Sequence, residues 1–365
     1  MTKSGLDPKK FEAAIDGKAT ALFVLTNANG MEVCICNYGG TIVSVMAPDR
    51  NGRFANVVLG FDNIETLANS PEPTFGSTIG RYGNRIAKGQ FTLAGITYQV
   101  PLSQAPNCLH GGMKGFHFKV WDVVESSSSS ITLRYVSADG EEGFPGTLTS
   151  TVKFTLTDGN AIRIDYSATT DKLTLCNLTN HSYFNLAGLT DGKPAPVITD
   201  HVLTMHCDAY IPVDATCIPL GRRDKVEGTP FDFRTPHVIG ERIDADHEQI
   251  RNGAGYDHCF AVNRGDSKLP HWADVEDCIL ASEAECPTTG RTMRTYTTEP
   301  GVQLYTANWL SGFAGINGTT FPRRSGFCLE AQHHPDSPNQ PTFEQATLAP
   351  GETYRQVTVY EFGVK

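Results

Sequence analysis

The stretch LTSTVKFTLTDGNAIRIDYSA, residues 148–168, alternates apolar and polar side chains with a period of two. The alternation covers residues 148–156, stops at Asp158-Gly159 and resumes over 162–168. Successive side chains of a strand point to opposite faces, and Asp-Gly is a favoured hairpin turn. The stretch therefore predicts an antiparallel β-hairpin with one buried face.

Similar hairpins are predicted outward from this one, over residues 91–100 across Ala94-Gly95 and over 121–135 across the serine run 126–130. Helical signals are few and short, with one at Asp7-Pro8 leading toward Ile15 and one opened by Asp62. The 35 Gly and 21 Pro residues are spread along the whole chain, which favours many short strands and turns over a linker between domains. We expect an all-β fold, a large antiparallel β-sandwich of two sheets with a few short helices, forming one domain over residues 1–365.

Composition excludes several classes of protein. With 39% hydrophobic and 19% charged residues, the chain matches neither a disordered nor a membrane-spanning protein. The formal net charge of −10 argues against nucleic acid and against an anionic membrane surface as partners. The first residues lack a secretory signal, and no run approaches the roughly 18 apolar residues of a spanning helix, so we expect a cytoplasmic protein.

The ten cysteines include no C-x-x-C pair, and most stand in apolar settings such as VCIC at residues 33–36. A reducing compartment does not support a disulfide framework. We therefore expect reduced, structural thiols that pack as small hydrophobic side chains.

Two residues require a chemical explanation. Glu330 stands in an apolar, strand-like run, FCLEAQ at 327–332, where an ionised carboxylate is costly without a partner or a task. His181 lies among polar and aromatic residues in TNHSYFNL, residues 179–186, without a turn signal. One carboxylate and one imidazole are enough to take one proton from a substrate and to give it another.

Strand alternation would place Glu330 and Gln332 on one face, and Gln303 on a face with Tyr305 and Trp309. Aromatic rings beside amides and carboxylates are typical of sugar sites, because the rings cover C–H faces while the polar groups bind hydroxyls. A half-buried strand with an exposed Gln303 accounts for this composition at least as well.

Seven motifs follow one another along nearly the whole chain. They are GRYGNRI at 80–86, NCLHGG at 107–112, EGFPG at 142–146, NHSYFNL at 180–186, GYDH at 255–258, GVQLY at 301–305 and EAQ at 330–332. In this order they resemble the motif set of the aldose 1-epimerases, also called galactose mutarotases. The resemblance implies the galactose mutarotase-like β-sandwich and an isomerase that interconverts the α and β anomers of free aldohexoses such as galactose and glucose.

The resemblance also implies residue roles. Glu330 would be the general base on the C1 hydroxyl and His181 the general acid at the ring oxygen, with no cofactor. For His181 to carry a proton near neutrality, we expect its pKa at or above the unperturbed value of about 6.5, raised by carboxylates such as Asp257 and Glu330.

The substrate-binding residues implied by the resemblance are Asn84, Arg85, His110, Asp257 and Gln303. Taken singly, each has a plainer explanation, because His110 reads as a turn residue, Arg85 as an exposed charge and Asp257 as a loop cap. Their common order in the motif set carries the assignment.

A metal site formed by Glu330 with His333 and His334 is a weak alternative, since adjacent strand residues point to opposite faces and Pro335 ends the run, and we expect none. Two other functions remain open, a hexose-6-phosphate 1-epimerase and a non-catalytic carbohydrate-binding protein. The motifs supply mainly Arg81 and Arg85 as basic groups, which favours an unphosphorylated monosaccharide. We expect a monomer or weak homodimer.

Overall fold

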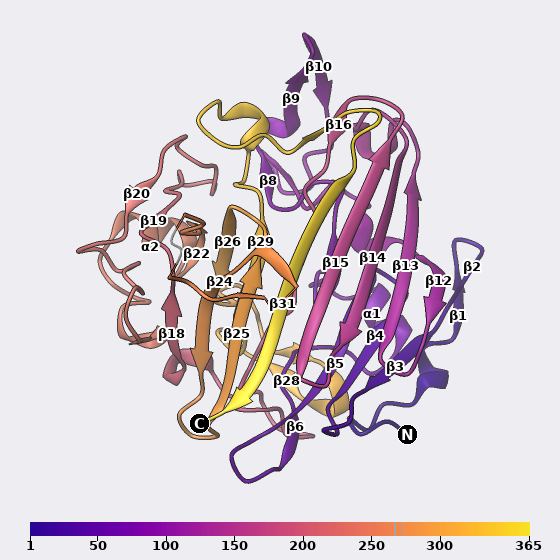
Figure 1. Ribbon diagram of the computed structural model, residues 1–365, viewed down its shortest axis with the longest axis vertical. Helices are drawn as coiled ribbons and strands as arrows, with labels where there is room; N and C mark the ends of the chain where they lie inside the picture. The colour runs from indigo at the N-terminus through magenta and orange to yellow at the C-terminus, as the bar shows by residue number, and fades with distance from the viewer. Residues whose placement is uncertain (266–267, 273) are drawn as a thin grey trace.

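The hairpin at residues 148–168 lies inside a large antiparallel sheet in the computed structural model of the chain, which describes residues 1–265, 268–272 and 274–365 (Figure 1). Strand β14 (Leu148–Leu156) pairs with β15 (Ala161–Thr170) in the register that joins Leu156 to Ile162. Alternate β14 residues, among them Val152 and Phe154, are fully buried. The predicted hairpin is confirmed.

Within the described residues this sheet has ten strands. In spatial order they are β12 (Asp122–Ser126), β13 (Ser130–Ser137), β14, β15, β31 (Tyr354–Val364), β25 (Arg291–Thr297), β24 (Val275–Glu285), β18 (Val202–Met205) and β21 (His237–Val238), with β23 (His271–Trp272) beside β24.

The other described strands form several smaller sheets, where the sequence predicted a sandwich of two sheets. A five-stranded sheet runs β20 (Asp224–Lys225), β19 (Ala209–Tyr210), β22 (Asp257–Ala261), β26 (Gly301–Tyr305), β29 (Cys328–Gln332), and a four-stranded sheet runs β3 (Leu22–Thr26), β4 (Glu32–Cys36), β5 (Thr41–Pro48), β6 (Phe54–Asn56). Strand pairs are β1 (Ala13–Ile15) with β2 (Lys18–Thr20), β7 (Thr78–Ile79) with β17 (Thr179–Asn180), β8 (Arg85–Ile86) with β11 (Cys108–Leu109), β9 (Gln90–Leu93) with β10 (Ile96–Gln99), β16 (Thr174–Leu175) with β30 (Thr347–Leu348), and β27 (Phe313–Ala314) with β28 (Thr320–Phe321).

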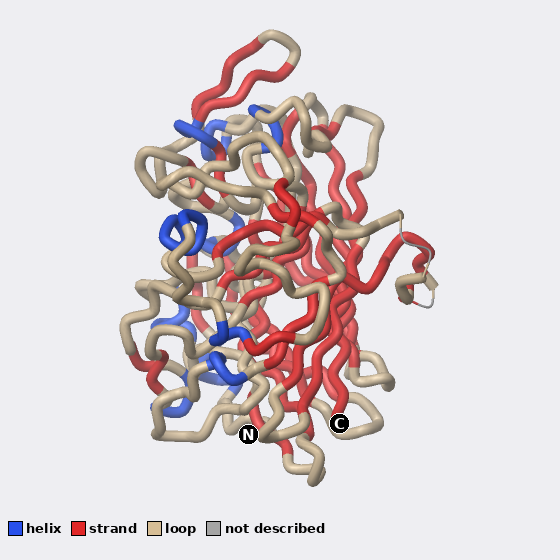
Figure 2. The backbone as a smooth tube through the Cα atoms, turned by 90° about the vertical axis from the view of Figure 1, so that its left-hand side faces the viewer, coloured by secondary structure: helices blue, strands red, loops and turns tan. Residues whose placement is uncertain are grey.

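The helices are short and lie mostly to one side of the strand layers (Figure 2). They are α1 (Ile64–Ala68), α2 (Glu248–Gly253) and the 3-10 turns η1 (Pro8–Phe11), η2 (Ala87–Gly89), η3 (Phe116–Phe118), η4 (Glu141–Gly143), η5 (Ile198–Asp200), η6 (Ile239–Glu241), η7 (Ile316–Gly318) and η8 (Ser337–Asn339). None of the helices in the described part of the chain has the length and apolar character needed to cross a bilayer.

The two expected helices differ from their predictions in detail. The first ends at Phe11, because residues from Ala13 onward pair with β2 instead of continuing the helix. The second is capped by Asn63, whose side-chain oxygen accepts the backbone N–H of Thr66 at 2.8 Å, one residue later than predicted.

The hairpin β9–β10 and the pairing of β12 with β13 across the exposed serine run are both confirmed. β9–β10 projects from the top of the molecule (Figure 1). The β-rich fold with few short helices thus agrees with the sequence prediction.

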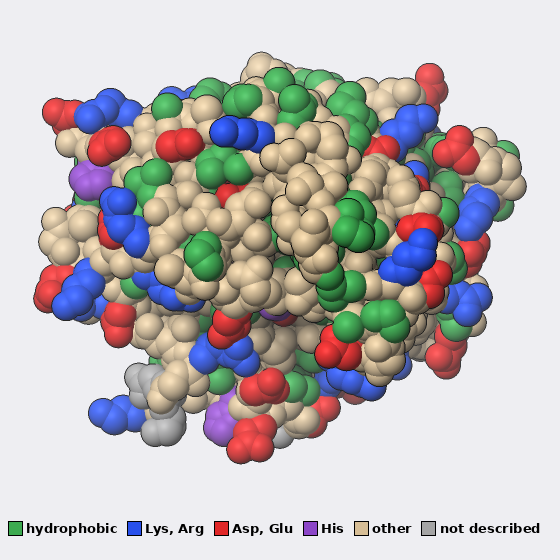
Figure 3. All heavy atoms as spheres, turned by 90° about the horizontal axis from the view of Figure 1, so that it is seen from above, with side chains coloured by type: hydrophobic (Ala, Val, Ile, Leu, Met, Phe, Trp, Pro, Cys, Tyr) green, Lys and Arg blue, Asp and Glu red, His purple; other side chains and the backbone are tan. Residues whose placement is uncertain are grey.

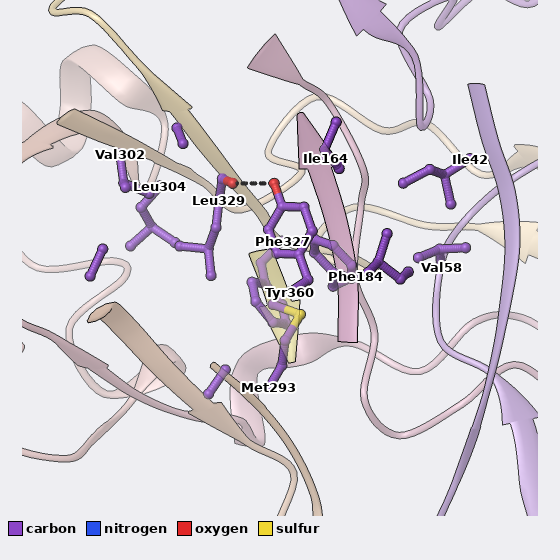
Figure 4. Close-up of a cluster of buried hydrophobic side chains, with 14 of the residues drawn as sticks. Ile42, Val58, Ile164, Phe184, Met293, Val302, Leu304, Phe327, Leu329 and Tyr360 are labelled. Atoms are coloured by element: carbon purple, nitrogen blue, oxygen red, sulfur yellow. Dashed lines mark hydrogen bonds between the residues drawn. The ribbon is translucent and has the colours of Figure 1, made fainter. Parts of the chain in front are cut away.

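The hydrophobic core connects the large sheet to the five-stranded sheet. Tyr360 on β31 lies beside Phe184 and Phe327, and its hydroxyl donates to the carbonyl of Leu329 on β29 at 2.8 Å (Figure 4). The same hydrophobic cluster takes in residues from Leu25 to Phe362, so we propose that residues 1–365 form one domain. This cluster also packs against one face of β29, which leaves the opposite face of that strand for polar side chains.

Candidate functional site

A cavity of about 350 Å³ opens where β29 and β22 meet four segments from the first half of the chain. Its lining residues are Glu72, Pro73, Thr74, Asn84, Arg85, Ser103, Gln104, Leu109, His110, Gly112, Met113, His117, Phe118, His181, Tyr183, Asp257, Tyr305, Trp309 and Glu330. All the site residues predicted from the sequence line this cavity except Gln303, whose side chain bonds to Asp257.

Strand register brings the polar groups of the five-stranded sheet together. β26 lies between β22 and β29, with Gln303 opposite Glu330 and Tyr305 opposite Asp257. Period-two alternation buries Leu329 in the core and turns Glu330 toward the cavity. The predicted strand and its facing are confirmed.

Glu330 and His181 form the closest acid and base pair in the cavity wall. Glu330 Oε1 lies 3.6 Å from His181 Nε2, and the two side chains are 2% and 6% exposed. Glu330 Oε2 is buried and has no hydrogen-bond partner among the described residues. Glu330 therefore keeps unused acceptor capacity in the cavity wall.

Burial dominates the protonation of this pair. It raises the pKa of Glu330 well above its ordinary value, and the neighbouring negative charge of Asp257 raises it further, against the opposing effect of Arg85. Burial lowers the pKa of His181 to about 4. The prediction of a His181 pKa at or above 6.5 was therefore wrong, because loss of hydration outweighs the nearby carboxylates.

The imidazole of His181 is held in place from several sides. Tyr183 stacks on it with ring centroids 4.9 Å apart, and His110 meets it edge-on at 5.1 Å. Cys328 Sγ on β29 lies 3.5 Å from Nδ1. These contacts leave Nε2 as the nitrogen that faces Glu330.

Asn84 and His110 fix each other across the β8–β11 pair. The backbone N–H of His110 donates to the Asn84 carbonyl at 3.0 Å, and the backbone N–H of Asn84 donates to His110 Nδ1 at 3.2 Å. Both residues have left-handed backbone conformations, with φ of 62° and 53°. Such conformations persist only where the surroundings hold them, as the reciprocal bonds do here.

The glycine that follows His110 in the NCLHGG motif is required for a steric reason. Gly111 has a φ of +85°, and a Cβ there would lie 2.1 Å from the carbonyl oxygen of Gly80. Only glycine fits this approach, which seats the His110 loop against the GRYGNRI segment.

A chain of polar contacts connects three of the predicted substrate-binding residues, Arg85, Asp257 and Gln303. Gln104 Oε1 accepts from Arg85 Nε at 2.7 Å, and Arg85 Nη2 lies 3.9 Å from Asp257 Oδ2. Gln303 Nε2 donates to Asp257 Oδ1 at 2.6 Å. Gln303 thus orients Asp257, while Arg85 and Asp257 present a donor and an acceptor to the cavity.

Sequence reasoning missed several lining residues, among them Glu72, Thr74 and His117. Thr74 Oγ1 donates to Glu72 Oε1 at 2.7 Å, and burial raises the pKa of Glu72. The buried ring of His117 also lines the cavity, and burial lowers its pKa to about 3. Their local sequence resembles an ordinary loop, so no signal marked them.

Arg81, which the sequence offered as a basic group of the motifs, does not line the cavity. Its guanidinium donates to the carbonyls of Pro145 and Gly146 at 2.9 and 2.8 Å and to Ser137 Oγ at 2.6 Å. It therefore joins the GRYGNRI and EGFPG motifs and leaves Arg85 as the guanidinium among the described lining residues.

Two trios of possible metal ligands occur in the described residues, His110-His181-Glu330 and Asp200-His201-Cys286. His110 accepts an N–H at Nδ1, so its neutral ring carries a proton on Nε2 and has no free lone pair. His201 is bonded at both nitrogens, to Asp200 and to the backbone N–H of Leu186. Neither trio has the donor set that a metal ion needs.

The weak alternative of a His333-His334 metal cluster is not formed. His333 Nδ1 lies 2.6 Å from Glu299 Oε2, whereas His334 Nδ1 lies 3.6 Å from Cys259 Sγ. The two rings have different partners, and neither ring lines the cavity. That the chain works without a metal stays a prediction.

The family model described as aldose 1-epimerase matches residues 21–361. Galactose mutarotase from Rattus norvegicus is 41% identical over 349 residues, covering 95% of each chain, and aldose 1-epimerase from Escherichia coli (strain K12) is 37% identical over 352 residues, covering 96% of this chain and 97% of that protein. The solved structure of a GalM/aldose epimerase homologue from C. elegans superposes with a TM-score of 0.84 at 27% identity, covering 95% of this chain and 99% of that one.

The electrostatics of the cavity can be tested on Asp257. Asp257→Asn removes a negative charge beside Glu330, so we expect the pKa of Glu330 to fall toward its ordinary value. The measurement is a pH titration of the protonated carboxyl band by infrared difference spectroscopy, with the band assigned by its loss in Glu330→Gln.

The matched control is Asp165→Asn, which removes an equivalent charge on β15, where Asp165 pairs with Arg163 outside the cavity. It should leave the pKa of Glu330 unchanged. A titration that is the same in Asp257→Asn and in the unchanged protein would contradict the proposed coupling.

Proposed function

The chain belongs to the aldose 1-epimerase family of isomerases and interconverts the α and β anomers of aldoses, and we propose that Glu330 and His181 perform the two proton transfers on free hexoses such as galactose and glucose. The observation that carries this assignment is the 3.6 Å approach of Glu330 Oε1 to His181 Nε2 in the wall of a cavity large enough for a sugar ring. Both groups can reach one substrate at once.

The reaction needs one proton removed and one delivered. Glu330 takes the proton of the C1 hydroxyl, the C1–O bond to the ring oxygen breaks with its electron pair going to that oxygen, and His181 protonates it. The open-chain aldehyde then rotates about C1–C2, and the ring closes on the other face with both transfers reversed. Protons and electrons balance within the pair and the sugar, so no cofactor is required.

The cavity pair works with a single shared proton. The competent form has a carboxylate and an imidazolium, and the resting form keeps the same proton on Glu330, because burial raises the pKa of Glu330 and lowers that of His181. The two forms differ only in whether that proton is on Glu330 or on His181. The pair titrates as a unit, so its apparent pKa values belong to neither residue alone.

Sugar hydroxyls would be held by the surrounding groups. Arg85 offers donors from a rigid fork, Asp257 accepts, and Asn84 and His110 complete the set beside the reacting centre. Gln303 supports this set by fixing Asp257. Tyr305 and the 65% exposed ring of Trp309 supply apolar surface at the wall and the mouth.

The charge of the cavity supports an unphosphorylated substrate. Among the described lining residues, Arg85 is the guanidinium, while Glu72, Asp257 and Glu330 are carboxyls. On the upper face of the molecule, acidic and basic side chains are interspersed (Figure 3). A phosphate group has no basic cluster to bind within this cavity.

We place the enzyme in the cytoplasm as part of the same proposal. All ten cysteines, which lie in the described part of the chain, are free, and reduced thiols are typical of that compartment. A monomer or weak homodimer acting on a monosaccharide, without nucleic acid or membrane partners, remains our prediction.

The function is tested on Glu330. Glu330→Gln keeps the shape of the side chain but cannot take a proton, so we expect kcat for galactose mutarotation to fall by roughly 10²–10⁴ with KM largely kept. Polarimetry, corrected for the spontaneous rate, measures both constants. Absence of mutarotation in the unchanged protein would refute the enzyme and favour a non-catalytic carbohydrate-binding protein.

The pH dependence follows from the pKa shifts. Below the lowered pKa of His181, about 4, the pair binds a second proton and loses its base. Above the raised pKa of Glu330 it loses its last proton and with it the acid. We expect a bell-shaped profile of kcat/KM against pH. Its acid limb should lie well below the unperturbed histidine pKa of about 6.5.

His181→Asn distinguishes the two limbs. Without the imidazole, Glu330 acts only as a base, so the small residual rate should rise with pH where the unchanged enzyme declines. If the alkaline decline survives in His181→Asn, another group such as His110 is the acid.

Substrate range is the third test. Galactose and glucose should both turn over, whereas glucose 6-phosphate should have a kcat/KM at least about tenfold lower because of like-charge repulsion in the cavity. Glu72→Gln should narrow this difference, while Glu65→Gln on the exposed side of α1 should not. A preference for the phosphate would instead support a hexose-6-phosphate 1-epimerase.

A further inference from the structure

The proton shuttle at His181 sets a requirement on its other nitrogen. Nε2 must give its proton to the ring oxygen and take it back, and it faces Glu330 Oε1 at 3.6 Å. While Nε2 is unprotonated, the neutral ring carries its hydrogen on Nδ1. Efficient turnover therefore needs an acceptor at Nδ1, because otherwise the ring can shift its hydrogen to Nε2 and lose the lone pair that receives the proton.

The structure supplies a sulfur atom at that position. Cys328 Sγ lies 3.5 Å from His181 Nδ1, an ordinary distance for an N–H donor and a sulfur acceptor. Cys328 is fully buried on β29, two residues from Glu330, with its side chain on the same face. The strand that positions the base thus also positions a partner for the acid.

The second imidazole in the cavity shows the opposite arrangement. His110 Nδ1 accepts the backbone N–H of Asn84 at 3.2 Å, so its hydrogen is fixed on Nε2. His110 can donate to a sugar oxygen but cannot accept a proton without breaking that bond. The two histidines therefore differ in what faces Nδ1, which is a donor at His110 and a sulfur at His181.

We propose that Cys328 is a positioning residue whose sulfur accepts the Nδ1–H of His181 and so keeps Nε2 free to exchange protons. Sulfur is a weak acceptor, and a hydrogen bond involving the backbone of His181 acts in the same direction, so the thiol shares this role. The inference rests on the proposed function of His181 as the acid. It adds the side chain that selects the working tautomer.

The chain contains a matched control for this contact. Cys259 Sγ, on β22 of the same five-stranded sheet, lies 3.6 Å from His334 Nδ1, and both side chains are buried and outside the cavity lining. Cys259→Ala removes the same thiol from the same kind of contact without touching His181. It separates the effect of losing a buried sulfur from the effect on the proton shuttle.

The direct test is the tautomer of His181 in protein labelled with ¹⁵N at histidine. Long-range ¹H–¹⁵N spectra at neutral pH, with the His181 signals assigned by their loss in His181→Asn, should show the hydrogen on Nδ1 in the unchanged protein. Cys328→Ala should transfer part of the population to the Nε2–H tautomer, and Cys259→Ala should not. An Nε2–H tautomer in the unchanged protein would overturn the proposal without any variant having to fold.

Kinetics provides the second readout. Cys328→Ala should lower kcat about tenfold, the effect of one hydrogen bond, with KM within about twofold. Cys328→Ser should recover most of this loss because a hydroxyl oxygen also accepts, whereas Cys259→Ala should keep kcat within about twofold. Unchanged kcat in a folded Cys328→Ala protein would refute the role.

Failure of this inference is distinguishable from failure of the proposed function. Mutarotation by the unchanged protein, and its loss in Glu330→Gln, test the enzyme and do not depend on Cys328. The tautomer spectra test Cys328 and do not depend on turnover.

Discussion

The alternation of side chains along β29 is the constraint on which the rest of this structure depends. Leu329 and Ala331 enter the core, where the Tyr360 hydroxyl binds the Leu329 carbonyl, and this fixes the strand against the large sheet. Glu330 must then face the cavity, and Cys328 faces the same way. A register shift of one residue would bury the carboxylate in the core and turn Leu329 to the substrate.

Burial of that carboxylate determines the chemistry of the cavity. An isolated ionised group is costly away from water, and so is an isolated imidazolium, so Glu330 and His181 shift their pKa values in opposite directions. A pair that holds one proton between two sites suits a reaction that moves one proton on and another off. In the mechanism that we propose, the loss of hydration that makes these two groups costly to bury also matches them as acid and base.

The imidazoles in the cavity wall show how contacts assign different tasks to one type of side chain. A backbone N–H fixes the hydrogen of His110 on Nε2, whereas a sulfur lies beside Nδ1 of His181. His117 has no partner at Nδ1 among the described residues, and burial keeps it neutral. Tautomer and charge therefore come from neighbouring groups on other strands rather than from the residue itself.

The sequence by itself determined three hairpins, among them the central one, and the face of β29 on which Glu330 lies, because period-two alternation and turn residues act over a few neighbours. Through its ordered motifs it also determined the family, and it named Asn84, Arg85, His110, His181, Asp257 and Glu330, which all line the cavity. Only the tertiary structure decided the direction of the His181 pKa shift, the hydrogen bond of Gln303 to Asp257, the structural role of Arg81 and the presence of Glu72 and His117 in the cavity wall. Each of these depends on burial and on contacts between segments that are distant in the chain. A local sequence pattern predicts neither.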